Sequence, residues 1–133
     1  MNNYINLSEN TDSEEIAIGN GYSQLSGREI KDQLVGKQFL GGYINGFQYI
    51  IAINADGSLE GNNNYQHYDT GSWSIDIEKG TLSVNWKNGW DNTTTRLYEI
   101  DKEIRMYDKE TGKWRTSLKQ QIDKVQNIKN HQF

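Results

Sequence analysis

The sequence predicts an all-β fold, an eight-stranded antiparallel up-and-down barrel with a short helix before it and a C-terminal helix after it. From residue 37 onward apolar and polar residues alternate, which is the period of a β-strand. The 133-residue chain has 13 glycines and no proline, and glycine supplies the backbone conformations that tight hairpin turns need. The links between apolar runs are short, which favours antiparallel neighbours, because a parallel crossover needs about a dozen residues or more.

Eight runs of alternating residues follow one another in this part of the chain. Turn sequences such as residues 54–57 separate them, and Trp114, Thr116 and Leu118 mark the last run. Because an eight-stranded meander leaves two exposed edges unless it closes, we predict a closed barrel, with an open twisted sheet capped by a helix as the alternative. The third run is polar on both faces, which favours a place at an edge or rim. The predicted strands span residues 37–44, 47–54, 58–65, 69–77, 81–87, 93–100, 103–108 and 113–118.

A short helix over residues 26–35 is predicted at the start of the barrel domain, which spans residues 25–118. Ser26 and Glu29 have the spacing of a capping box, in which each side chain satisfies a free backbone amide of the first turn. Gly36 follows, and glycine readily takes the left-handed conformation that ends a helix.

Both ends of the chain are expected to lie outside the barrel. Residues 1–24 have few large apolar side chains, so we predict a disordered acidic leader. Its apolar patch, residues 16–18, is the one part able to add a strand or dock on the domain. Residues 119–133 return to helical spacing, which predicts a C-terminal helix or tail that packs outside the barrel or plugs one end of it.

Charge and composition exclude several classes of function. The formal net charge is −4, and all of this excess comes from four acidic residues that precede Arg28. The rest of the chain is balanced, so we expect no nucleic-acid binding, which needs a basic face. No apolar run approaches the roughly 20 residues of a membrane span. The chain has no cysteine and no visible signal peptide, so we expect a cytoplasmic protein without disulfides.

Four short motifs of turn and aromatic residues follow one another along the chain. They are Leu34-Val35-Gly36-Lys37, Asp56-Gly57, Gly71-Ser72-Trp73 and Gly80-Thr81-Leu82 with Trp86 following. In this order, residues 25–118 resemble a family of small bacterial domains of unknown function. The resemblance implies a lipocalin-like (calycin-like) barrel and no defined activity. Where that family normally carries cysteines, this chain has Ser83 and the threonines of residues 93–95.

No recognisable catalytic or metal-binding set occurs in the sequence. His67 is the only interior histidine, and with Asp69 it makes two ligands, too few for a defined zinc site. There is no nucleophile elbow and no glycine-rich phosphate loop. The carboxylates of the barrel, including Asp69, are expected at turns or on solvated polar faces. We therefore predict no catalytic residue, no metal and no cofactor.

Aromatic residues and one arginine are the remaining candidates for a site. The chain has 4 Trp, 8 Tyr and 3 Phe, and most are expected to fill the core. Trp90 lies in a polar loop, where it marks a ligand mouth or a partner contact, or packs as a lid. Arg96 shares a strand face with Tyr98 and Ile100. If that face points inward, Arg96 needs a carboxylate or an anionic ligand; if it points outward, the arginine carries no special meaning.

Two functions follow as hypotheses. The first is a non-catalytic binding module for a small apolar or amphipathic ligand inside the barrel. The alternative is a protein-interaction or accessory domain with a filled barrel, which contacts a protein partner through the acidic leader, the C-terminal helix and Trp90. An enzyme is the hypothesis with least support. For the first, the residues expected to line the cavity are Tyr49, Trp73, Trp86 and Arg96, with Tyr65, His67 and Trp90 at its mouth.

Overall fold

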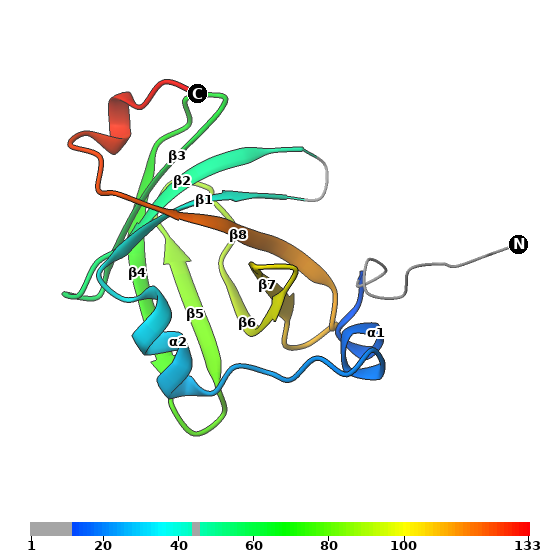
Figure 1. Cartoon of the computed structure of the whole chain (residues 1–133). Helices are drawn as coiled ribbons and strands as arrows, with labels where there is room; N and C mark the ends of the chain where they lie inside the picture. The colour runs from blue at the N-terminus through cyan, green and yellow to red at the C-terminus, as the bar shows by residue number, and fades with distance from the viewer. Residues whose placement is uncertain (1–11, 44–45) are drawn as a thin grey trace, which may run out of the picture.

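A computed structural model describes residues 12–43 and 46–133 and shows eight antiparallel strands closed into one barrel (Figure 1). Each strand pairs with the next in sequence, and β8 pairs with β1. The predicted closed barrel is therefore confirmed, and the open sheet is excluded. The strands are β1 (Lys37–Gly42), β2 (Gln48–Ile53), β3 (Ser58–Asn63), β4 (Asp69–Asp76), β5 (Thr81–Trp86), β6 (Thr93–Ile100), β7 (Glu103–Asp108) and β8 (Trp114–Ile122).

The barrel interior is filled by one apolar cluster to which all eight strands contribute. Along β2, Tyr49, Ile51 and Ile53 belong to this cluster, while the intervening Ile50 and Ala52 lie in a separate cluster on the outer face. Alternate residues of a strand point to opposite faces, so both faces of β2 are apolar and buried. A second segment of the chain must therefore cover the outside of this strand.

Strand β3 pairs on both sides, with β2 and with β4, so its prediction as an edge was wrong. Gly61 explains part of its polar appearance: a Cβ at this position would lie 2.7 Å from the Trp90 ring and 3.2 Å from the Trp86 ring. Two tryptophans thus fill the interior volume that β3 leaves empty. On the outer face, Asn62 is fully buried and donates to two carbonyl oxygens of the 3-10 helix η1 (Ile128–Asn130), at 3.2 and 3.1 Å.

Helix α2 (Gly27–Leu34) closes one end of the barrel (Figure 1). The predicted capping box is present: the Glu29 amide donates to Ser26 Oγ at 3.1 Å, and the Ser26 amide donates to Glu29 Oε1 at 2.9 Å. Ile30 and Leu34 are fully buried in the interior cluster. The helix therefore seals this end with aliphatic side chains.

The part of the predicted leader that the structure describes, residues 12–24, is ordered, which corrects that prediction; residues 1–11 lie outside the described residues. Helix α1 (Glu14–Gly19) begins after Ser13, whose Oγ accepts the Ile16 amide hydrogen at 3.2 Å. Ala17 is fully buried against Tyr98 and its neighbours on the outer face of β6 and β7. The physical reason is that this outer face is apolar and α1 covers it.

The predicted C-terminal helix was also wrong. Strand β8 continues to Ile122 because its residues pair with β1, and the hydrogen bonds of that pairing close the barrel. An extended stretch and the single turn η1 follow. Ile122, Val125 and Ile128, which suggested a helix by their spacing, pack together against Ile50 on the outer face of β2. The spacing of these apolar residues therefore reflects their burial against the barrel and not a helical conformation.

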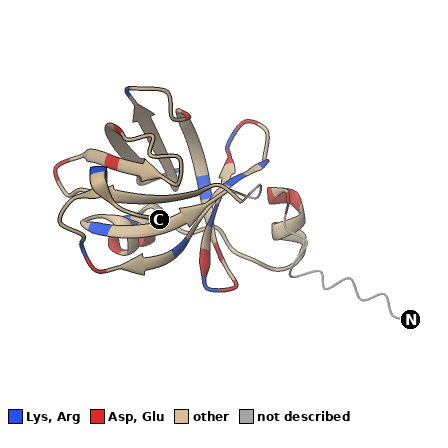
Figure 2. Ribbon diagram, turned by 90° about the horizontal axis from the view of Figure 1, so that it is seen from above, with Lys and Arg blue, Asp and Glu red and all other residues tan. Residues whose placement is uncertain are grey.

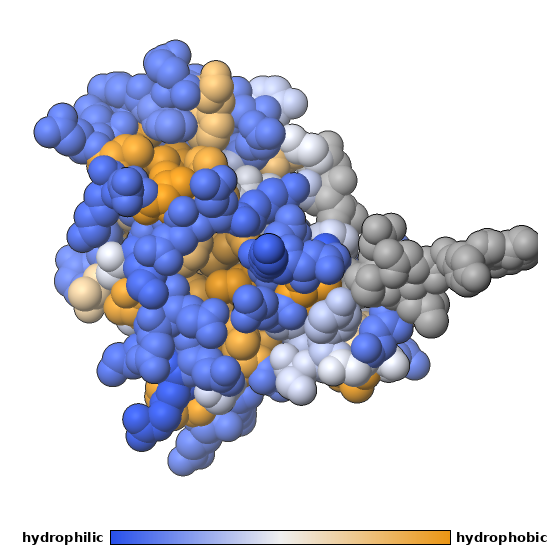
Figure 3. Space-filling model, in the orientation of Figure 1, coloured by the Kyte–Doolittle hydropathy of each residue, from blue (hydrophilic) through white to orange (hydrophobic). Residues whose placement is uncertain are grey.

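Charged residues of both signs are interspersed over the strands and loops (Figure 2). Polar residues cover most of one face of the molecule, and hydrophobic residues are visible in hollows between them (Figure 3). None of the helices in the described part of the chain is long and apolar enough to span a membrane.

Candidate functional site

Two adjoining spaces lie at the barrel end opposite α2, which we call the mouth. A void of about 60 Å³ lies inside the barrel, and a hollow of about 290 Å³ lies at the mouth. The four residues that line both are Tyr43, Tyr49, Trp90 and Asp91. Sites for small molecules span roughly 300–1,000 Å³. The interior is thus mostly filled by side chains, and the mouth hollow is the candidate site.

Trp90 packs as a lid between the hollow and the interior. Its ring centroid lies 4.6 Å from that of Trp86 and 5.9 Å from that of Tyr49. The indole Nε1–H donates to the carbonyl oxygen of His67 at 3.1 Å. Trp90 is therefore one of the four side chains that lie between the apolar interior and the open mouth, and it is only partly buried.

Asp69 holds the loop that carries Trp90. The carboxylate is fully buried and accepts hydrogen bonds from the backbone amides of Asn88, at 2.9 and 3.1 Å, and of Trp90, at 3.1 Å. It also accepts from the Thr70 amide at 2.7 Å. The expectation of a solvated carboxylate was wrong here, because these amides replace water around the charge.

A β-bulge brings Arg115 to the mouth. The pairing of β8 with β7 skips this residue, since Trp114 and Thr116 pair with consecutive residues of β7. The Nη2 atom of Arg115 lies 3.1 Å from Oδ2 of Asp91, on the loop that also carries Trp90. The same bulge turns Trp114 to the outer face, where the Arg105 guanidinium lies 4.5 Å from its ring centroid.

Most of the predicted cavity residues line the interior void. Tyr49, Trp73 and Trp86 all border it. The Tyr49 hydroxyl hydrogen-bonds to Thr116 Oγ1 at 2.7 Å, and burial raises the pKa of this tyrosine well above its ordinary value. The Trp73 indole donates to the Asn54 carbonyl oxygen at 2.8 Å. These side chains are fixed parts of the core.

The residues predicted at the mouth divide into two groups. His67 and Trp90 line the mouth hollow. Tyr65 does not line it: its side chain is 70% exposed and its ring packs on Phe47, with the centroids 4.7 Å apart. Tyr65 therefore lies beside the mouth and points outward.

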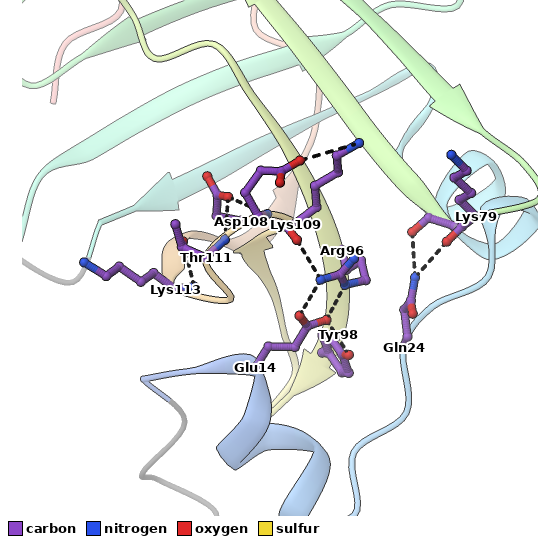
Figure 4. Close-up of polar contacts among 11 residues, drawn as sticks. Glu14, Gln24, Lys79, Arg96, Tyr98, Asp108, Lys109, Thr111 and Lys113 are labelled. Atoms are coloured by element: carbon purple, nitrogen blue, oxygen red, sulfur yellow. Dashed lines mark hydrogen bonds and ion pairs between the residues drawn. The ribbon is translucent and has the colours of Figure 1, made fainter.

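The placement of Arg96 in the cavity was wrong. Arg96 and Tyr98 do share a face, but it is the outer face that α1 covers (Figure 4). Arg96 donates to both carboxylate oxygens of Glu14, at 2.6 and 2.9 Å, and the Tyr98 hydroxyl donates to the same carboxylate at 2.7 Å. Burial raises the pKa of Glu14, but the hydrogen bonds from Arg96 and Tyr98 outweigh it, so the pKa lies below its ordinary value. This partly buried ion pair anchors α1 to the barrel.

Several residues of the mouth were missed by the sequence prediction. Tyr43 and Phe47 flank the turn between β1 and β2, and the alternation of Phe47 with Tyr49 was a usable signal. Asn63 lines the hollow from the end of β3. No sequence pattern indicated Arg115 as a residue of the site, because strict alternation along the strand places it on the opposite face from Thr116, which lines the void.

His67, on the wall of the hollow, contacts a backbone group. Nε2 of His67 lies 3.1 Å from the carbonyl oxygen of Asn88, a backbone group and not a carboxylate. Within residues 12–43 and 46–133, no group of three or more acidic or histidine side chains is placed to hold a metal ion.

No known protein family, curated protein or solved structure gives a significant match to this chain. The resemblance to small bacterial domains with a calycin-like barrel therefore stays a prediction.

Proposed function

We propose that this protein is a non-catalytic binding module for a small amphipathic molecule, with a calycin-like barrel as scaffold and the mouth hollow as binding site. The observation that carries the proposal is the hollow of about 290 Å³, which is close to the size of small-molecule sites and adjoins an apolar void.

The walls of the hollow suit an amphipathic ligand. Its aromatic residues, Tyr43, Phe47, Tyr49 and Trp90, offer large and rigid apolar surfaces. Its polar residues, Asn63, His67 and Asp91, offer hydrogen-bonding groups. Apolar and aromatic walls with a few polar groups are typical of small-molecule sites, because the walls supply affinity and the polar groups fix orientation.

The lid gives the site a means to adapt to its ligand. Trp90 lies on a loop between β5 and β6, and its indole makes a single hydrogen bond, to His67, within the described residues. Displacing this indole joins the hollow to the void behind it. A ligand can then insert an apolar group where the indole packs on Trp86.

The alternative, a protein-interaction domain with a filled barrel, is favoured by the small interior void and by Tyr65. This exposed ring extends the aromatic surface of the rim beyond Phe47. A partner that packs on the rim would bury Tyr65, whereas a small ligand in the hollow would leave it exposed.

The proposal is tested with 2-naphthol, a neutral amphipathic probe, by tryptophan fluorescence and thermal unfolding. We expect saturable quenching and a rise in Tm, because a ligand that binds only the native state adds about 2.7 kcal/mol of stability at one hundred times its Kd. Phe47→Ala should weaken binding, and Phe133→Ala, which removes an exposed ring outside the hollow, should not. Absence of any response, or equal weakening by the two variants, contradicts the proposal.

A further inference from the structure

Arg115 lines the interior void, next to Asp91, which lines both the void and the hollow, and among the described residues it is the only Lys or Arg that lines either space. Resting on the function proposed above, we infer that the ligand is an aromatic carboxylic acid whose carboxylate binds the Arg115 guanidinium while its ring lies between the aromatic walls of the hollow.

The guanidinium of Arg115 has donors to spare. An arginine carries five N–H donors in a planar fork. One of them, on Nη2, bonds to Asp91 at 3.1 Å, and the described part of the chain shows no other hydrogen bond from this guanidinium. A planar fork with free donors matches a carboxylate in a bidentate arrangement, which is stronger and more directional than a single contact.

The present partner of Arg115 is easily displaced. The Asp91 side chain is 66% exposed and that of Arg115 is 36% exposed. Ion pairs this open contribute only about 0–1 kcal/mol, since water solvates both charges well. A ligand carboxylate anchored by ring contacts can therefore take the place of Asp91, which returns to water.

Tyr43 adds a further donor beside this pair. Burial raises the pKa of Tyr43, the charge of Asp91 raises it further, and Arg115 acts in the opposite direction. The phenol therefore lies near both charges and stays protonated at neutral pH. In that state it can donate a hydrogen bond to a carboxylate bound at Arg115.

The rings around the hollow favour an aromatic body over a flexible chain. Tyr43 packs edge-on to Phe47, with centroids 5.7 Å apart, and lies 5.6 Å from Tyr49. Aromatic pairs prefer offset or edge-to-face arrangements, and a planar ligand ring can adopt these with several walls at once. With Trp90 in place, the void of about 60 Å³ behind it has no room for an extended chain.

The test compares 2-naphthoate with 2-naphthamide, the same ring system without the charge, by isothermal titration calorimetry at low ionic strength. We expect wild type to bind naphthoate at least about tenfold more tightly, the size expected for charge-assisted hydrogen bonds. Arg115→Gln should remove this preference and leave naphthamide binding unchanged. Asp91→Asn should strengthen naphthoate binding about threefold, because it removes a weak competing carboxylate. Arg28→Gln, the same change at an exposed position of α2 at the other end of the barrel, is the matched control and should have no effect.

The outcomes separate this inference from the proposed function. Equal binding of naphthoate and naphthamide overturns the carboxylate inference and leaves the binding module standing. Equal weakening of both probes by Arg115→Gln, or weaker naphthoate binding by Asp91→Asn, also overturns the inference. Failure of both probes and of 2-naphthol overturns both proposals together.

Discussion

The two ends of the barrel are closed in different ways. At one end, α2 buries Ile30 and Leu34 completely in the interior cluster and is fixed by its capping box. At the mouth, one partly buried indole, Trp90, fills the opening, and a hollow remains outside it. Fully burying an aliphatic side chain stabilises a protein by about 1.5–3 kcal/mol. The helical end is therefore the fixed one, and the mouth is the end at which the proposed ligand would enter.

This difference also predicts where the molecule opens first. Native proteins open locally where few apolar side chains are buried, at a cost well below that of global unfolding. The loop between β5 and β6, which carries Trp90, is held chiefly by Asp69 and by the packing of Trp90 on Trp86. The helical end is held by the interior cluster itself, so opening there requires disruption of the core.

The largest expected effect is at the helical end. In Gly27→Ala, the new Cβ would lie 2.5 Å from Cα and 2.6 Å from the carbonyl oxygen of Ile77, which are backbone atoms that cannot rotate away. We expect a loss of about 3 kcal/mol in the free energy of unfolding, measured by urea denaturation, although alanine is the better helix former. Gly19→Ala in α1, where nothing lies within 4 Å, is the control. A loss no larger than in that control would show that α2 is not held tightly against the barrel.

A smaller effect is expected in the segment that leads into the helical end. Glu14→Gln keeps the shape of the side chain but removes the charge that Arg96 and Tyr98 bind. We expect a loss of about 2 kcal/mol at neutral pH, the size of a charge-assisted hydrogen bond in a partly buried setting. Glu15→Gln, one residue along and exposed, should change stability by less than about 0.5 kcal/mol.

The contribution of Glu14 also depends on pH. Because its folded-state pKa is lowered, the stabilisation is fully present above the ordinary glutamate pKa of about 4.3 and is lost as pH falls through the folded value. The gap in stability between wild type and Glu14→Gln should thus stay constant from pH 8 to pH 6 and narrow below about pH 4. A gap that does not narrow in acid would show that the charge of Glu14 is not what anchors α1.

The smallest effect on stability is expected at the mouth. In Gly61→Ala, the new Cβ would lie 2.7 Å from the Trp90 ring, which is the far end of a side chain and can swing outward. We expect a loss of about 1 kcal/mol together with a red shift of tryptophan emission as the indole meets water. In a Trp90→Phe background the shift should vanish. A stability loss as large as that of Gly27→Ala would remove the contrast between the two ends.

Sequence periodicity predicted the strand order because the inward residues of this barrel are apolar on almost every strand. Periodicity was misleading where another segment of the chain covers the outside of the barrel, because apolar residues are buried on the outer face there as well. Ala17 and Ile128 both cover outer faces of the barrel, one from α1 and one from η1. Alternation within a strand shows which residues share a face, as for Arg96 and Tyr98, but not which face is inward when both are buried.

The candidate site was predicted in part for a related reason. Tyr49, Trp86 and Trp90 are aromatic residues on or next to inward positions, so composition and spacing indicated them. Arg115 reaches the mouth only through a bulge, and a bulge is a property of the pairing of two strands. Neither strand alone carries that information.

The pairing of β8 with β1 has a consequence for how the chain folds during synthesis. These strands are the last and the first of the barrel, and Gly42 of β1 pairs with Ser117 of β8. Until β8 leaves the ribosome, β1 and β7 remain open edges that can pair with other chains. The barrel therefore closes only after β8 has emerged, and until then the seven earlier strands must avoid pairing with other chains.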